Sequence, residues 1–139
     1  MSAVDLQTPS PRMLALLPPQ NRTFWTSGAT GQLKLLRSRS TRRWMHPFWN
    51  VADDDPDLVA EPVSGNGQVF TFTINQHTYN PQAPAPYVIA IIQLPEQDDL
   101  RIASNIVDCD PSEIEIGMPV RVRFEQHGDI AVPVFAPVR

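Results

Sequence analysis

The stretch ASNIVDCDPSEIEIGMPVRVRFEQ, residues 103–126, decides the fold of this 139-residue chain. It contains the end of one strand, a tight acidic loop, a single helical turn and, after Gly117, the start of a second strand. In that second strand Val120, Val122 and Phe124 alternate with charged residues. Alternation with a period of two is typical of a strand that has one buried face and one solvated face. We therefore predict a small β-barrel for the second half of the chain.

Four more strands are expected around this stretch, over residues 68–78, 87–94, 100–107 and 130–135. In the first of them, Phe70, Phe72 and Ile74 are expected to share one face because they are two positions apart. Asp110 and Pro111 are typical of the N-cap and first residue of a helix, which predicts a helical turn over residues 111–115. Five strands with one such turn between the third and fourth match a five-stranded OB-fold barrel, so the predicted fold class is mainly β.

The first half of the chain differs from the barrel. Residues 1–20 are Pro-rich and lack periodicity, which predicts a flexible arm. Residues 21–36 predict a short helix, a break at residues 28–31, and then a short strand or helix. Residues 53–57 contain four Asp and one Pro and are predicted to be a solvated turn or linker. We thus expect an arm (1–20), a helix with a ribbon-like segment (21–60) and an OB-fold domain (61–139).

Composition narrows the classes of protein to which the chain can belong. No apolar run approaches the ~20 residues that cross a bilayer, and the start of the sequence lacks the pattern of a secretory signal. The single cysteine, Cys109, excludes an internal disulfide and fits a reducing compartment. We therefore expect a cytoplasmic protein without a membrane partner.

Charge is distributed unevenly along the chain. Residues 1–52 hold seven Lys or Arg and one Asp, a net +6, whereas residues 53–139 hold 14 acids and four Arg, a net −10. Such an asymmetry indicates two surfaces with different partners, or one half that docks on the other.

Catalytic signatures are missing from the sequence. There is no Ser/His/Asp or Cys/His pattern, no Gly-rich phosphate loop and no metal-ligand spacing. Cys109 stands between Asp108 and Asp110, and neighbouring carboxylates blunt the nucleophilicity of a thiol. His77 has no positioned partner that would make it an acid or base. We predict no catalytic residue and no cofactor.

The basic and aromatic segment of the first half is the candidate binding site. Guanidinium groups bind phosphates and carboxylates in a bidentate manner, and Trp and Arg dominate binding energy at protein interfaces. Three functions remain open for the arginines: contact with a partner protein, contact with the phosphates of coenzyme A, and neutralisation of the acidic barrel. The nearby aromatic residues favour the partner protein. The candidate residues are Phe24, Trp25, Lys34, Arg37, Arg39, Arg42, Arg43, Trp44 and Trp49.

Several motifs together resemble one known family. They are Phe24-Trp25, VSGNGQVFTFT at 63–73, Pro86-Tyr87, IVDCDPSEIEIGMPVRVRFE at 106–125 and VPVF at 132–135. In this order they resemble the accessory proteins known as domain of unknown function 35 (DUF35), which combine a rubredoxin-like zinc ribbon with an OB fold. The resemblance covers residues 21–137.

The resemblance also implies a metal site that this sequence lacks. Family members carry two Cys-x-x-Cys pairs, of which the first would fall at Ser38 and Thr41 and the second within residues 49–55. A structural zinc ion needs four thiolate or imidazole ligands, and His46 is the only such residue in this segment. We therefore expect a degenerate ribbon without metal, in which packing of Trp44, Phe48 and Trp49 replaces the zinc.

By resemblance, the expected function is a non-catalytic accessory subunit of a thiolase-superfamily enzyme that acts on acyl-CoA substrates, with acyl-CoA at the shared interface. A retro-aldolase of steroid or other lipid side chains is the first choice, and an acyltransferase or thiolase complex is the alternative. The rival class is an OB-fold binder of single-stranded nucleic acid. The acidic barrel disfavours that class, because such sites combine a positive groove with exposed aromatics.

Overall fold

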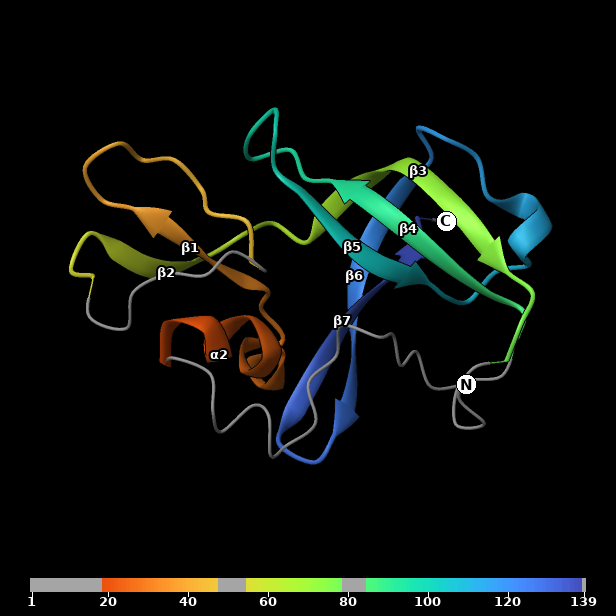
Figure 1. The fold of residues 1–139 in the computed structure, drawn as a ribbon, viewed down its shortest axis with the longest axis horizontal. Helices are drawn as coiled ribbons and strands as arrows, with labels where there is room; N and C mark the ends of the chain where they lie inside the picture. The colour runs from red at the N-terminus through yellow and green to blue at the C-terminus, as the bar shows by residue number, and fades with distance from the viewer. Residues whose placement is uncertain (1–18, 48–54, 79–84, 139) are drawn as a thin grey trace.

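The computed structural model describes residues 19–47, 55–78 and 85–138. The chain begins with helix α2 (Pro19–Thr26) and the 3-10 turn η1 (Ser27–Thr30), followed by strands β1 (Lys34–Ser38) and β2 (Leu58–Pro62). The other strands are β3 (Asn66–Asn75), β4 (Tyr87–Gln93), β5 (Arg101–Ile106), β6 (Pro119–His127) and β7 (Ile130–Pro137), and the 3-10 turn η2 (Pro111–Glu113) lies between β5 and β6. The helix and the β1–β2 sheet lie on one side of the barrel (Figure 1).

Strands β3 to β7 form a closed barrel in the order β3-β4-β5-β7-β6, which confirms the predicted OB fold. All pairs are antiparallel except β5 with β7, which pair in parallel at Ile106 and Phe135. A buried side chain adds a further hydrogen bond between β5 and β7, since the Ser104 hydroxyl donates to the carbonyl of Pro133 at 2.9 Å. The predicted cap is also confirmed: Asp110 accepts a hydrogen bond from the Ser112 amide, and Pro111 opens the turn.

Burial follows the predicted alternation in β6 but not in β3. In β6 the apolar residues from Val120 to Phe124 face inward and the arginines between them are exposed. In β3 the pairing with β4 shifts between Val69 and Thr71. A bulge of this kind inserts one residue and turns the following side chains to the other face. The prediction that Phe70 shares a face with Phe72 and Ile74 was therefore wrong, since Phe70 is exposed while the other two pack against the core.

Two predictions for the first half also need correction. Helix α2 begins at Pro19, inside the segment that was predicted to be an arm, because proline is well suited to the first helical turn. Strand β2 was not predicted. It pairs antiparallel with β1, from Lys34 opposite Pro62 to Ser38 opposite Leu58, so β1 is a strand and not a helix. The rest of the predicted arm, residues 1–18, lies outside the described residues.

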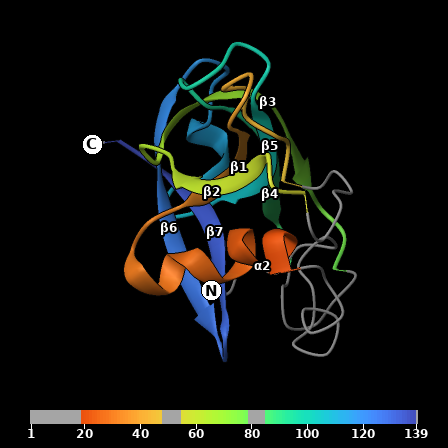
Figure 2. The ribbon, with the colours of Figure 1, turned by 90° about the vertical axis from the view of Figure 1, so that its left-hand side faces the viewer.

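One hydrophobic core joins the helix, the small sheet and the barrel. Phe24, Trp25, Leu33 and Leu35 belong to the same buried cluster as the inward residues of the barrel strands. Viewed from the side of the small sheet, α2 lies beside the β6–β7 hairpin and the turn η1 crosses in front of it (Figure 2). Strand β2 spans residue 60, where the sequence suggested a domain boundary, and the division of the chain into three parts stays a prediction.

Candidate functional site

Four of the five candidate basic residues lie at the end of β1 and in the tight loop that follows it. We call residues 37–43 the arginine loop. The Ser38 amide donates to the carbonyl of Arg43 at 2.8 Å, the Arg42 amide donates to the carbonyl of Ser38 at 2.9 Å, and Arg37 forms a β-bridge with Trp44. Arg42 closes the turn with φ of 61°, a left-handed conformation that non-glycine residues adopt only at a cost.

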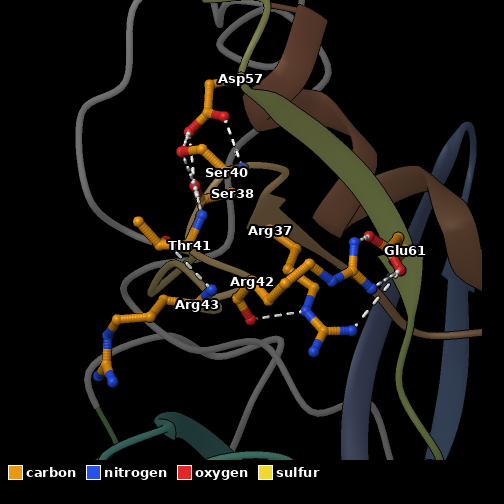
Figure 3. Close-up of polar contacts among 8 residues, drawn as sticks. All are labelled: Arg37, Ser38, Ser40, Thr41, Arg42, Arg43, Asp57 and Glu61. Atoms are coloured by element: carbon orange, nitrogen blue, oxygen red, sulfur yellow. Dashed lines mark hydrogen bonds and ion pairs between the residues drawn. The ribbon is translucent and has the colours of Figure 1, made fainter.

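The carboxylate of Asp57, just before β2, ties this loop to the second strand (Figure 3). It accepts hydrogen bonds from the Ser38 hydroxyl at 2.5 Å, from the Ser40 amide at 2.9 Å and from the Ser40 hydroxyl at 3.1 Å. The Ser38 oxygen in turn accepts from the Thr41 amide at 3.2 Å. The hydrogen bond from Ser38, followed by that from the Ser40 amide, lowers the pKa of Asp57. Residues 56 and 57 form a turn, which is one of the two alternatives predicted for residues 53–57, while residues 53 and 54 lie outside the described residues. Asp57 is not simply solvated, because it is half-buried and its oxygens accept hydrogen bonds from the loop.

Glu61 on β2 pairs with two of the candidate arginines. Its carboxylate accepts hydrogen bonds from both terminal nitrogens of Arg42 at 3.3 Å and forms an ion pair with one terminal nitrogen of Arg37 at 3.7 Å. The guanidinium of Arg37 also stacks over the ring of Trp44 at 4.6 Å and donates to the Arg42 carbonyl at 2.8 Å. Arg37 is thus held by an acid, an aromatic ring and the backbone together.

The end of the loop is attached to the barrel through the β4–β5 turn. The Trp44 amide donates to the side-chain oxygen of Gln97 at 2.8 Å, and the Gln97 side chain donates back to the Trp44 carbonyl at 3.3 Å. Arg43 reaches Asp99 at 2.8 Å, and both side chains are exposed. Two residues beyond Trp44, His46 forms a hydrogen bond with the backbone of Arg101, and partial burial lowers the pKa of His46 below 6.5.

The other candidate residues occupy different environments. Arg39 is exposed on the loop and contributes electrostatically to the low pKa of Asp57. Lys34 is half-buried at the start of β1, and its amide donates to the Ser27 hydroxyl. The rings of Phe24, Trp25 and Trp44 are buried within the chain's own core, while Trp49 and Phe48 lie outside the described residues. A role of these nine residues in binding stays a prediction.

Sequence reasoning missed the acidic and amide partners of the loop: Asp57, Glu61 and Gln97. No spacing in the sequence indicates them, since Gln97 contacts Trp44 across 53 residues. It also missed three exposed apolar side chains, at Phe70, Ile116 and Val138. Backbone hydrogen bonds link the segments around them, from Gly117 to Val69 and from Val138 to Pro119. The bulge in β3, which the sequence does not show, is what exposes Phe70.

A zinc ion does not fit the loop. At the two positions of the first expected Cys-x-x-Cys pair the chain has hydroxyls, and the Ser38 hydroxyl is already engaged by Asp57 and Thr41. Protonated hydroxyls and one carboxylate do not make the thiolate and imidazole set of a structural zinc site. Within residues 19–47, 55–78 and 85–138, no three His, Cys, Asp or Glu side chains gather so that they could hold a metal ion. Across the same residues, no helix is long and apolar enough to cross a membrane.

The barrel is similar to the OB-fold domain of a known protein family. A family profile for the C-terminal OB-fold domain of ChsH2 matches residues 60–125. A probable enoyl-CoA hydratase alpha subunit from Thermomonospora curvata is 32% identical over 135 residues, which are 91% of this chain and 41% of that protein. The 3-oxo-4,17-pregnadiene-20-carboxyl-CoA hydratase alpha subunit of Mycobacterium tuberculosis is 32% identical over 115 residues, 82% of this chain and 36% of that protein.

Similarity extends to a scaffold protein and to a solved complex. A DUF35 domain-containing scaffold protein of Methanothermobacter thermautotrophicus is 44% identical over 64 residues, 45% of this chain and 47% of that protein. The chain thus spans less than half of the length of each of these three relatives. A chain of the structure titled Ltp2-ChsH2(DUF35) aldolase superposes with a TM-score of 0.70 at 29% identity, covering 83% of this chain and 92% of that one.

Proposed function

This chain belongs to the DUF35 family of OB-fold proteins, and on that premise we propose that it is a non-catalytic accessory subunit of an enzyme that acts on acyl-CoA. The partner is a thiolase-superfamily subunit that carries the reactive residues. The observation that carries the proposal is the superposition, over 83% of this chain, with a chain of the structure titled Ltp2-ChsH2(DUF35) aldolase.

The reaction of the partner is proposed from the relatives. Two of them are named as alpha subunits of hydratases for CoA thioesters, one of which has a pregnadiene substrate, and the solved neighbour is titled an aldolase. These names favour an aldolase that cleaves the side chain of a steroid or another lipid CoA thioester. A scaffold relative from an archaeon supports the alternative, an acyltransferase or thiolase complex in which the small chain holds larger subunits together.

We place the partner contact at the arginine loop. Arg39, Arg42 and Arg43 are exposed, and the acids that face two of them, Glu61 and Asp99, are bound through surface ion pairs. Exposed pairs are weak, so an acidic partner surface or a coenzyme A phosphate can compete for the guanidinium groups. The pairs also support the third function considered for the arginines, which is to neutralise acids of this chain. The experiment below separates the three functions.

The test begins with capture of the partner. The tagged chain is isolated from its native cells, and the proteins bound to it are identified by mass spectrometry. The proposal expects a thiolase-like subunit, which is then purified and mixed with the chain, and the mass of the complex is measured in solution. A chain that remains monomeric with that subunit, or that turns over acyl-CoA alone, contradicts the proposal.

Charge reversal then separates the three functions of the loop. Arg39→Glu with Arg43→Glu should weaken complex formation at least about ten-fold if the loop meets the partner. If it meets coenzyme A, the complex should form normally while the KM for acyl-CoA rises. If the arginines serve only the chain itself, both measurements stay unchanged and the midpoint of urea unfolding falls. Arg121→Glu, which replaces an exposed arginine on the outer face of β6, is the matched control.

A further inference from the structure

The loop at which the family pattern expects a metal is closed by a carboxylate. Ser38 and Thr41 stand at the positions of the first expected Cys-x-x-Cys pair, and they contact each other through the Ser38 oxygen and the Thr41 amide. Asp57, which lies just before β2, accepts hydrogen bonds from Ser38 and Ser40. Figure 3 shows the three hydroxyl-bearing residues of the loop gathered below the Asp57 carboxylate.

From this geometry we infer that Asp57 performs the structural role of a metal ion. Its two oxygens clamp the arginine loop to the start of β2, so that the loop is closed without zinc. A metal in a ribbon joins two chain segments through shared ligands. Asp57 likewise joins two chain segments. Ser40 and Ser38, which are 17 and 19 residues away in sequence, both donate hydrogen bonds to its carboxylate.

The backbone supports the same attachment. The Arg39 amide donates to the Asp57 carbonyl at 2.7 Å, which extends the β1–β2 ladder into the loop. The Asp57 amide donates to the side chain of Asp55 at 3.0 Å, which fixes the direction of the preceding turn. Arg39 from the loop favours the carboxylate anion, and the Asp55 side chain contacts the backbone of Asp57. Asp57 is therefore held in place by hydrogen bonds of its backbone and of its carboxylate oxygens.

Closure of the loop constrains the backbone that carries the arginines. Residue 42 adopts a left-handed conformation, which persists only where the surrounding contacts determine it. The clamp supplies those contacts on one side of the turn, and Glu61 supplies them on the other. We infer that Asp57 positions Arg39 and Arg42 for binding. This last step rests on the proposed function, whereas the clamp itself is a property of the isolated chain.

Hydrogen exchange of single amides, followed by NMR, tests the clamp directly in the full-length chain. The Ser40 amide reports on the Asp57 carboxylate and the Thr41 amide on the Ser38 oxygen, because each donates to that atom. In Asp57→Asn both amides should exchange about ten-fold faster, since the loss of a charge-assisted hydrogen bond shifts local opening by that order. Amides of the barrel strand β7 should keep their wild-type rates. Asp98→Asn, at an exposed acid in the β4–β5 turn, should change neither amide.

Metal dependence gives an independent readout. The purified wild-type chain should contain no stoichiometric zinc, and neither zinc nor a chelator should change the exchange of Ser40 and Thr41. Exchange in Asp57→Asn at the wild-type rate, or protection that requires added zinc, would overturn the clamp. If Asp57→Asn unfolds the barrel as well, Ser38→Ala serves in its place and should accelerate the Thr41 amide with the barrel intact. These measurements need no partner, so they fail or succeed separately from the proposed function.

Discussion

Gly28 lies directly against the ring of Phe124, and a Cβ atom at position 28 would overlap the ring atoms Cδ1, Cγ and Cε1. Gly28 belongs to the turn η1 that follows helix α2, and Phe124 belongs to strand β6 of the barrel. The missing side chain therefore sets how closely the N-terminal segment approaches the barrel.

Gly28→Ala should destabilise the chain by about 1–3 kcal/mol, the range found when a methyl group is forced into a packed contact. The ring of Phe124 must move, and it packs against the core. Urea unfolding measures the change. In a Phe124→Ala background the same substitution should cost little, because the ring is absent, and a full cost there would contradict the contact. Ala29→Ser, in the same turn and exposed, is the control.

Gln97 should contribute more to stability than Arg43, although both residues join the arginine loop to the barrel. Gln97→Ala leaves the part-buried Trp44 amide without its acceptor, at a cost of about 1–3 kcal/mol. Arg43→Ala removes an ion pair whose side chains are 59% and 61% exposed, and such pairs contribute little. Urea midpoints of the two variants should fall in this order. The reverse order would show that the loop is attached mainly through charge.

Position 42 should prefer glycine to alanine, against the usual order. Both Arg42→Gly and Arg42→Ala lose the pair with Glu61, but only glycine relieves the left-handed backbone at φ of 61°. We expect the glycine variant to be more stable by about 1 kcal/mol, which is the lower end of the cost of that conformation. Thermal unfolding of the two variants at equal concentration measures the difference. Equal melting temperatures would mean that the backbone at position 42 relaxes freely.

Stability should decrease as the pH falls below about 6.5, and His46 is the reason. Burial lowers the pKa of His46 in the folded chain, so the unfolded chain binds a proton first. The stabilisation that neutral His46 provides is fully present above its pKa in the unfolded chain. It is lost as the pH falls through the lower pKa of His46 in the folded chain. Urea midpoints between pH 7.5 and 5.5 measure this loss, and His46→Gln should flatten the curve in that window. An unchanged slope in His46→Gln would assign the effect to other groups.

Stability should also decrease with falling pH in a second range, which lies below 3.8, the ordinary pKa of Asp. Hydrogen bonds from Ser38 and Ser40 lower the pKa of Asp57, so its contribution is present above 3.8 and is lost as the pH falls through the lowered value. The NMR shift of the Ser40 amide proton should follow this titration, with a midpoint below 3.8. In the control variant Asp98→Asn the Ser40 amide should keep the same midpoint, because Asp98 is exposed in the β4–β5 turn. A Ser40 midpoint at or above 3.8 would contradict the clamp.

The barrel could be predicted because its information is local. Period-two alternation in residues 120–124, the Asp110-Pro111 cap and the spacing of five apolar runs each depend on neighbours in sequence, and the structure confirms them. The bulge that exposes Phe70 could not be predicted, because it arises from the pairing of β3 with β4 and not from the residues of β3 alone. The same holds for β2, whose five residues become a strand only by pairing with β1.

For the candidate site, the sequence by itself determined which residues are basic and where they cluster, since charge is a property of each side chain. It also determined that cysteine is absent from both places where the family pattern expects a Cys-x-x-Cys pair. Only the tertiary structure decided what each arginine faces, because Asp57, Glu61 and Asp99 reach the loop from 17 to 56 residues away. It likewise decided that the rings of Trp25 and Trp44 are buried in the chain's own core. Contacts of that range depend on the folded path of the chain, and a linear pattern does not contain it.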